Sequence, residues 1–144
     1  MKVKRGASLT NWGIGGTGSL GRSDERNQTM AYILIVDSQA QFRHRLVRLL
    51  ESAGHQAAAV ATITEAAGIL QTEVPDLLAT DVVLTDGSST NLTEQAAALG
   101  VKTLMMTGNP DRIIEFDGAG QPYLSKPFPP NVFVQRVEEI LAGI

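Results

Sequence analysis

The chain has 144 residues, of which 43% are hydrophobic and 19% are charged, and it contains no cysteine. One domain with its own core is the simplest organisation for this length. Without cysteine the chain has no disulfide, thiolate nucleophile or Cys-ligated zinc, and its two histidines are too few for a histidine metal cage. No apolar run approaches the ~20 residues of a membrane span, and no signal peptide is evident, so we expect a cytoplasmic protein without a membrane partner.

Charge divides the chain into two parts. Residues 1–29 hold five Lys/Arg against two acids, a net charge of +3, whereas residues 30–144 hold seven against thirteen, a net charge of −6. An acidic body has no electrostatic footprint for nucleic acid. We therefore expect proteins or cations as partners and no nucleic acid.

The first 29 residues predict a flexible N-terminal leader or extension, because they are rich in Gly, Ser, Thr and Asn and show no periodicity. They contain Gly13, Gly15 and Gly18 at the spacing of a dinucleotide-binding fingerprint. That fingerprint needs a strand before it and a helix after it, and neither is predicted here. We interpret the glycines as a linker and expect the folded domain to span residues 30–144.

From residue 30 onward, apolar runs alternate with amphipathic stripes. The runs predict strands at 32–36, 56–61, 76–80, 101–106 and 122–125. The stripes predict helices at 39–53, 62–70, 90–99, 111–116 and 129–142. Thr62 and Glu65 form a capping box, and Gly54 and Gly100 are expected to end helices. The alternation predicts a doubly wound α/β sandwich, (βα)5, with a five-stranded parallel sheet.

Four strands of this sheet end on a polar residue. These residues are Asp37, Asp81, Thr107 and Lys126. Each alone has an ordinary explanation, as a turn, a helix cap or a solvated lysine. Together they would meet in one crevice, because ligands of doubly wound sheets bind outside the carboxyl ends of the strands. Two carboxylates suit Mg²⁺, and one of them can also act as a nucleophile toward phosphorus, with a lysine and a hydroxyl supporting the phosphoryl group.

The segments "ILIVDS", "PDLLATDVV", "LMMTGNPD" and "YLSKPF" resemble the four signature blocks of the response-regulator receiver domain of two-component signalling. The match covers residues 31–142 in the right order and spacing. The resemblance implies the strand order 2-1-3-4-5 of the chemotaxis-regulator-like fold. It also implies that the protein is phosphorylated and uses Mg²⁺. Any enzymatic activity would be limited to phosphorylating and dephosphorylating itself.

Individual roles follow from the same resemblance. Asp81 is the expected phospho-acceptor, and Asp37 is one of the acids that organise the metal. The Val83 backbone carbonyl is a further metal ligand. Thr107 is expected to turn toward the phosphoryl group and Lys126 to pair with it. No organic cofactor is implied.

Two further positions match the family. Lys126-Pro127 resembles its cis peptide, and Tyr123 occupies its aromatic switch position. The implied partners are a sensor histidine kinase or phosphotransfer protein, and a downstream protein that binds the face of the fourth helix, fifth strand and fifth helix. A homodimer is an open alternative.

The sequence also departs from the family pattern. Ser38 stands where a second acid after the first strand is usual, so we expect a weaker metal site. The loop after Asp81 is about two residues short, and the fourth helix is expected to be abbreviated. Asp86 is a candidate substitute acid, although Asp-Gly is also a common turn.

Two functions remain open. The first is a single-domain response regulator that accepts a phosphoryl group on Asp81 and signals through protein contacts, because no further patterned segment follows the last helix. The second is a pseudo-receiver, an interaction module that is not phosphorylated, which the loss of the second acid favours. A nucleotide or flavin enzyme ranks behind both, because no glycine-rich phosphate loop follows the first strand.

Overall fold

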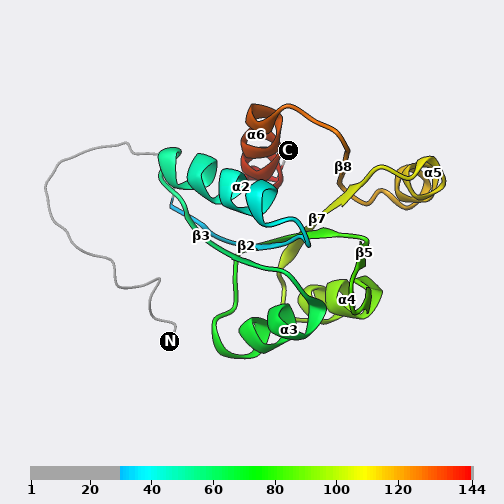
Figure 1. The fold of residues 1–144 in the computed structure, drawn as a ribbon, viewed down its shortest axis with the longest axis horizontal. Helices are drawn as coiled ribbons and strands as arrows, with labels where there is room; N and C mark the ends of the chain where they lie inside the picture. Colours follow the sequence, from blue (N-terminus) through cyan, green and yellow to red (C-terminus); the bar gives the residue numbers. More distant parts are fainter. Residues whose placement is uncertain (1–29, 144) are drawn as a thin grey trace, which may run out of the picture.

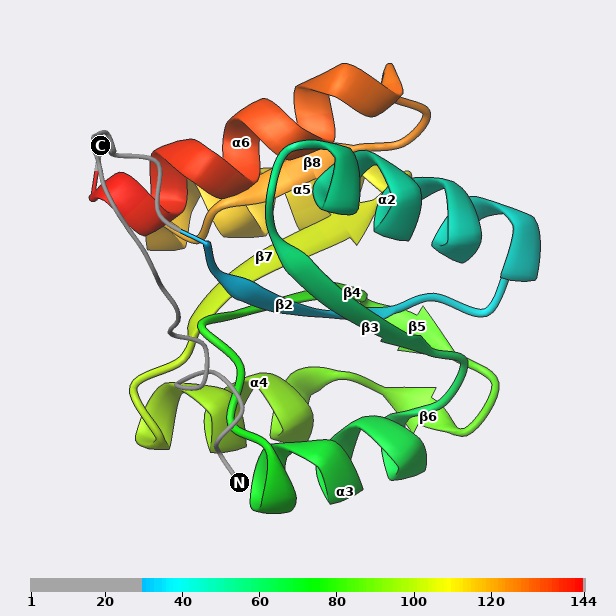
Figure 2. The same ribbon diagram turned by 90° about the vertical axis from the view of Figure 1, so that its left-hand side faces the viewer.

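In the computed structural model, which describes residues 30–143, a parallel β-sheet lies between two layers of helices (Figures 1 and 2). The strands are β2 (Tyr32–Val36), β3 (Gln56–Val60), β4 (Leu77–Asp81), β5 (Val83–Leu84), β6 (Gly87–Ser88), β7 (Lys102–Thr107) and β8 (Tyr123–Ser125). The helices are α2 (Ala40–Ser52), α3 (Ile63–Thr72), α4 (Thr90–Ala98), α5 (Pro110–Ala119) and α6 (Pro130–Ala142). The expected leader and its glycine spacing lie outside the described residues.

The main sheet has the strand order β3-β2-β4-β7-β8, and all neighbouring strands are parallel. This order confirms the predicted 2-1-3-4-5 sheet. Every residue of β2 and β4 is buried, as expected for central strands that are covered on both faces. The carboxyl ends of β2, β4, β7 and β8 consequently meet at one edge, next to the place where the chain order reverses.

Each face of the sheet has its own core. Ile33 and Ile35 face α2 and α6, where they pack with Leu46, Leu50, Phe133 and Val137. The alternate residues of the same strand, Leu34 and Val36, pack with Leu70, Leu92 and Ala96 of α3 and α4. Burying one such aliphatic side chain contributes about 1.5–3 kcal/mol to folding. The alternation therefore fixes which residues of each strand face which helix layer.

The predicted helix boundaries agree with the observed caps. The Thr62 hydroxyl accepts a hydrogen bond from the Glu65 amide at 3.2 Å, and the Glu65 carboxylate accepts one from the Ala61 amide at 3.1 Å. Gly54 and Gly100 follow their helices with φ of +94° and +80°, values that favour glycine. Local capping chemistry was therefore readable from the sequence.

Two predicted element boundaries were wrong, and one hairpin was not predicted. The helix expected at 111–116 is longer, because Asn109 caps its start and Gly120, in the left-handed conformation, ends it after Ala119. The loop after Asp81 forms a small antiparallel hairpin, β5–β6, in which Val83 pairs with Ser88. The predicted third strand is also shifted by one residue, so Asp81 is the last residue of β4.

Helix α5 lies beside β8 at the edge of the sheet, apart from the α3/α4 layer (Figures 1 and 2). It buries a single side chain, Phe116, in a small cluster with Val82 and Met105, against which Tyr123 packs. Within residues 30–143, no helix combines the length and apolarity that a membrane crossing requires.

Candidate functional site

Three charged side chains from three strand ends form an ionic cluster in which both acids are buried. The Lys126 ammonium lies 2.8 Å from Asp37 Oδ2 and 2.6 Å from Asp81 Oδ1. Asp37 is fully buried, and Asp81 is 9% exposed. Charges this deep need paired partners, because removing them from water is costly. The structure thus brings together the two acids and the lysine that the sequence singled out.

The chain holds Asp37 in place by its position between β2 and α2. Its Oδ1 accepts a hydrogen bond from the Gln39 amide at 2.8 Å. Its backbone carbonyl accepts one from Arg43 Nη1 at 2.7 Å, and its amide donates to the Val60 carbonyl at 3.1 Å. Both carboxylate oxygens of Asp37 are engaged, one by the backbone and one by Lys126, so its orientation is fixed.

Lys126 contacts an aromatic ring, which the sequence did not predict. Its Nζ lies 4.9 Å from the centroid of the Phe42 ring, a cation–π contact. Phe42 packs edge-on against Phe128, and Phe128 stacks on Phe133 in the core. The Lys126-Pro127 bond is cis, as the resemblance implied. Burial acts to lower the pKa of Lys126, but its hydrogen bonds and ion pairs with Asp37 and Asp81 outweigh burial and raise that pKa.

Burial raises the pKa of Asp81 from its ordinary 3.8 to about 6. The hydrogen bond from Lys126 lowers this pKa, and the neighbouring charge of Asp37 raises it. The carboxyl group is therefore ionised at neutral pH, yet it is poorly solvated. A carboxylate in this condition is available as a nucleophile.

Thr107 ends β7, and its hydroxyl accepts a hydrogen bond from the Asn109 amide at 3.1 Å. The Asn109 side chain then accepts one from the Asp111 amide at 2.9 Å, which caps α5. The sequence left a turn role open for Thr107, and the structure gives it that role. Thr107 is 7% exposed, and it lines the pocket described next together with Asp81.

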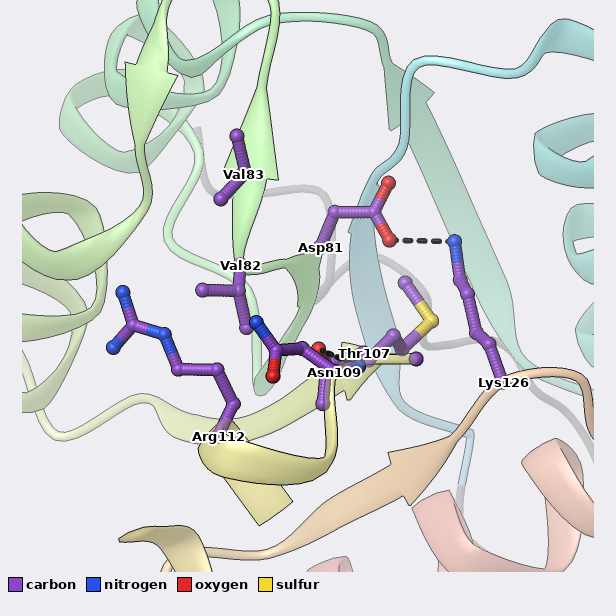
Figure 3. A pocket seen from close by; sticks show the side chains of 9 residues that line it. Asp81, Val82, Val83, Thr107, Asn109, Arg112 and Lys126 are labelled. Atoms are coloured by element: carbon purple, nitrogen blue, oxygen red, sulfur yellow. Dashed lines mark hydrogen bonds and ion pairs between the residues drawn. The ribbon is translucent and has the colours of Figure 1, made fainter.

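A pocket of about 310 Å³ opens beside Asp81. Figure 3 shows Asp81 pointing toward Lys126, and Arg112 on the opposite side of the pocket beside Val82. The lining residues are Asp81, Val82, Val83, Met106, Thr107, Gly108, Asn109, Arg112 and Lys126. The sequence analysis missed Arg112. Its position on the first turn of the helix, three residues after the capping Asn109, is the signal that marks it.

The remaining predicted residues take different places. Val83 lines the pocket with its side chain 68% exposed. Tyr123 does not line the pocket; its hydroxyl donates to Asp117 Oδ1 at 2.9 Å, and its ring lies 6.1 Å from that of Phe116. It is linked to the site through β7, where it pairs with Met105, two residues before Thr107.

Asp86 does not substitute for the missing acid. Its carboxylate accepts hydrogen bonds from the Ile63 amide at 3.0 Å and from the Thr64 amide and hydroxyl at 3.1 and 3.0 Å. These bonds, with that from Ile63 foremost, lower the pKa of Asp86. The short hairpin β5–β6 carries this residue to the start of α3, so it caps that helix and does not reach the pocket.

The carboxylates of Asp37 and Asp81 are the groups at this edge that suit Mg²⁺, which binds through one or two carboxylates, water and phosphate. Ser38 is exposed beside them. In the part of the chain that the structure describes, no group of three or more His, Asp or Glu residues is arranged to hold a metal ion. The donor set is therefore chemically suitable for Mg²⁺ but small.

Comparisons with known proteins agree with this geometry. The model of the response regulator receiver domain family matches residues 33–138. The phosphate regulon transcriptional regulatory protein PhoB of Klebsiella pneumoniae is 27% identical over 119 residues, which cover 78% of this chain and 52% of that protein. The chain thus spans about half the length of the curated relatives it matches.

Solved structures give the same result. A CheY-like response regulator receiver domain protein from Methanospirillum hungatei JF-1 is 28% identical, with a TM-score of 0.71 over 80% of this chain and 96% of that one. A two-component response regulator from Clostridium difficile, at 24% identity, supports the fold alone, with a TM-score of 0.70 over 78% and 97% of the two chains. From its sequence match and its fold, the chain belongs to the response regulator receiver domain family.

Proposed function

We propose that this receiver domain accepts a phosphoryl group on Asp81 from a histidine kinase or phosphotransfer protein. The observation that carries the proposal is the position of Asp81. Its carboxylate is buried at a strand end, 2.6 Å from the Lys126 ammonium, and it faces a pocket of about 310 Å³. A nucleophile, a cation and space for the incoming group therefore meet at one point.

In the proposed reaction, an ionised Asp81 oxygen attacks the phosphorus of a phosphohistidine. The new bond is Asp81 O–P, the N–P bond breaks, and the imidazole leaves with the bonding electrons and takes up a proton. The product is an acyl phosphate. Lys126 offsets negative charge on the phosphoryl oxygens, and the Thr107 hydroxyl can donate to them after releasing the Asn109 amide.

Mg²⁺ is the proposed cofactor, held by Asp37, Asp81 and the Val83 backbone carbonyl. When bound, it would neutralise charge on the phosphoryl oxygens. Because Ser38 contributes no charge, we expect weaker binding than at a site with a further acid.

The proposed output is a change on the face formed by α5, β8 and α6, which would bind a downstream protein. Thr107 and Tyr123 are the proposed switch pair, because they lie on adjacent strands and are separated by Met105. If the Thr107 hydroxyl turns toward the phosphoryl group, the space beside Met105 opens to the Tyr123 ring. Tyr123→Ala is then expected to leave labelling of Asp81 intact while weakening phosphorylation-dependent partner binding.

The direct test is labelling with Mg²⁺ and acetyl phosphate, followed by intact-mass measurement. The parent is expected to gain one phosphoryl group, with acetate as the leaving group. Asp81→Asn removes the nucleophile at nearly constant size and is expected to abolish the gain. Asp111→Asn, at the exposed start of α5, is the control and is expected to be labelled like the parent. Asp76→Asn would be a poor control, because the Asp76 carboxylate accepts a hydrogen bond from the Tyr32 amide at 2.7 Å.

One observation favours the alternative of a pseudo-receiver that is not phosphorylated. The residue beside Asp37 is a neutral, exposed serine, and Lys126 already pairs with both carboxylates. If the parent takes up no phosphoryl group at any Mg²⁺ concentration, this reading replaces the first. The chain would then act through the same α5–β8–α6 face without a phosphorylation step.

A further inference from the structure

The pocket beside Asp81 is lined by one acid and two bases. Lys126, one of the bases, is shared between Asp81 and the buried Asp37. Arg112 is the other, and among the described residues it pairs with neither of these acids. A phosphoryl group on Asp81 would add about two negative charges to this space. Lys126 cannot offset all of that charge, because Asp37 already uses part of it.

Arg112 is held only lightly in its present position. Its Nη1 lies 3.1 Å from Glu115 Oε1, three residues later on the same helix. The two side chains are 36% and 60% exposed. Pairs this exposed contribute little to stability, because water screens the attraction and ordering two long side chains costs entropy. Arg112 can therefore leave Glu115 for a stronger partner at small cost.

The chemistry of arginine suits the pocket. A planar guanidinium offers parallel N–H groups that match two oxygens of a phosphoryl group, which a lysine ammonium cannot do. Figure 3 shows Arg112 and Lys126 on opposite sides of the pocket, with Asp81, Thr107 and Asn109 between them. A phosphoryl group in this space would lie between two cations.

We propose that Arg112 is a phosphoryl-binding residue, which leaves Glu115 and donates to the phosphoryl oxygens once Asp81 is modified. Because the neutral Ser38 is expected to weaken Mg²⁺ binding, Arg112 would supply part of the positive charge that the metal supplies when it is bound. The proposal rests on the proposed phosphorylation of Asp81. It also gives α5 a direct connection to the modified aspartate, because Arg112 lies on the first turn of that helix.

Labelling at limiting and at saturating Mg²⁺ tests the proposal. Arg112→Gln is expected to slow labelling with acetyl phosphate about ten-fold at limiting Mg²⁺, the loss of one charge-assisted contact, and less at saturating Mg²⁺. Arg112→Lys keeps the positive charge but loses the paired N–H groups of the guanidinium. Its labelling rate should lie between those of the parent and Arg112→Gln. Glu115→Gln frees Arg112 and should label at least as fast as the parent.

A matched control exists on α6. Arg136 pairs with Glu139 at 3.4 Å with the same three-residue spacing, and its side chain is about as exposed as that of Arg112, 32% against 36%. Arg136→Gln removes the same charge away from the pocket, and it is expected to label like the parent. A second readout is the Nε–H signal of Arg112 in NMR spectra, which should shift on phosphorylation, whereas the Arg136 signal should not.

The outcomes separate the two proposals. If the parent is labelled and Arg112→Gln behaves like Arg136→Gln, with no shift of the Arg112 signal, the role of Arg112 is refuted and the function of Asp81 stands. If Glu115→Gln slows labelling as much as Arg112→Gln, the pair is structural and the proposal also fails. If the parent is not labelled at all, the proposed function itself is refuted.

Discussion

The two helices that follow the last strands of the sheet are anchored very differently. Helix α6 buries Phe133, Val137 and Ile140 in the larger core, against α2 and the sheet. Helix α5 buries Phe116 alone, in a cluster of three buried residues at the β8 edge, and its Ile114 side chain is 71% exposed. Helix α5 begins beside the pocket at Asp81, and α6 follows the loop that carries Lys126, so two sides of the pocket adjoin helices that are packed differently.

The firmly packed side supports the ionic cluster. Lys126 lies on Phe42, which leads through Phe128 to Phe133 in the core. The lightly packed side carries Thr107, Asn109 and Arg112, which would respond to a phosphoryl group. Regions with few buried apolar contacts open at lower free energy than the core. We therefore expect the ionic cluster, the fixed side of the pocket, to move less than the neighbouring α5.

The largest predicted effect tests this contrast in packing. Phe133→Ala removes a fully buried ring and should lower the free energy of unfolding by about 3–5 kcal/mol. Phe116→Ala should cost clearly less, below about 3 kcal/mol, because its cluster is small and opens to the surface. Urea denaturation of both variants measures the two losses. Equal losses would show that α5 is anchored as firmly as α6.

The second prediction concerns the number of carboxylates beside Asp37 and its effect on Mg²⁺ affinity. Ser38→Asp adds a carboxylate beside Asp37 and should tighten Mg²⁺ binding by roughly 10–100-fold, the usual scale for a change in ligand support. Labelling of Asp81 should then need less Mg²⁺. Ser52→Asp makes the same change in net charge at the other end of α2 and should leave Mg²⁺ affinity unchanged. Calorimetric titration with Mg²⁺ decides; unchanged affinity for Ser38→Asp contradicts the assignment of the metal site.

The third prediction concerns how the stability of the fold depends on pH through Asp81. Because the folded-state pKa of Asp81 is raised to about 6, its protonated form stabilises the fold. That contribution is complete below the unfolded pKa of about 3.9 and is lost as the pH rises through 6. Asp81→Asn resembles the protonated form, so it should be more stable than the parent at pH 7.

The stability gap between Asp81→Asn and the parent should close as the pH falls from 7 to 4. Urea denaturation across this range measures it. Nucleophilic reactivity should change in the same window, because about a tenth of Asp81 is ionised at pH 5 and about nine tenths at pH 7. A parent that is more stable than Asp81→Asn at neutral pH would mean that Lys126 outweighs burial and that the pKa is not raised.

The fixed side is also the side that the sequence predicted best. Continuous apolar runs located the strands, and the residues at their ends identified Asp37, Asp81 and Lys126 on this side and Thr107 on the other. This works because parallel strands buried on both faces must be apolar throughout, so a polar residue marks the end of a run. Helix caps such as Thr62 were readable for a similar reason, since their hydrogen bonds are local.

The features that escaped prediction depend on distant contacts. Asp86 caps a helix that begins 23 residues earlier, through hydrogen bonds to Ile63 and Thr64 that no local pattern encodes. The strands of the hairpin that carries it, β5 and β6, have two residues each, too few for any periodicity. Arg112 lines the pocket only because α5 lies beside β8. Sequence periodicity places a residue on a helix, but not the helix on the sheet.

The smallest predicted effect concerns the attachment of α5 to β8. The Tyr123 hydroxyl donates to Asp117 Oδ1 at 2.9 Å, and this hydrogen bond raises the pKa of the Tyr123 phenol. Tyr123→Phe removes the bond but keeps the ring beside Phe116, so the global unfolding midpoint should not change. The amide hydrogens of α5 should exchange several-fold faster, because the bond holds only this lightly packed helix. Arg136→Gln breaks a side-chain contact on α6 and should not change exchange in α5. Unchanged exchange in Tyr123→Phe would show that Phe116 alone anchors the helix, while a lowered global midpoint would place α5 in the same cooperative unit as α6.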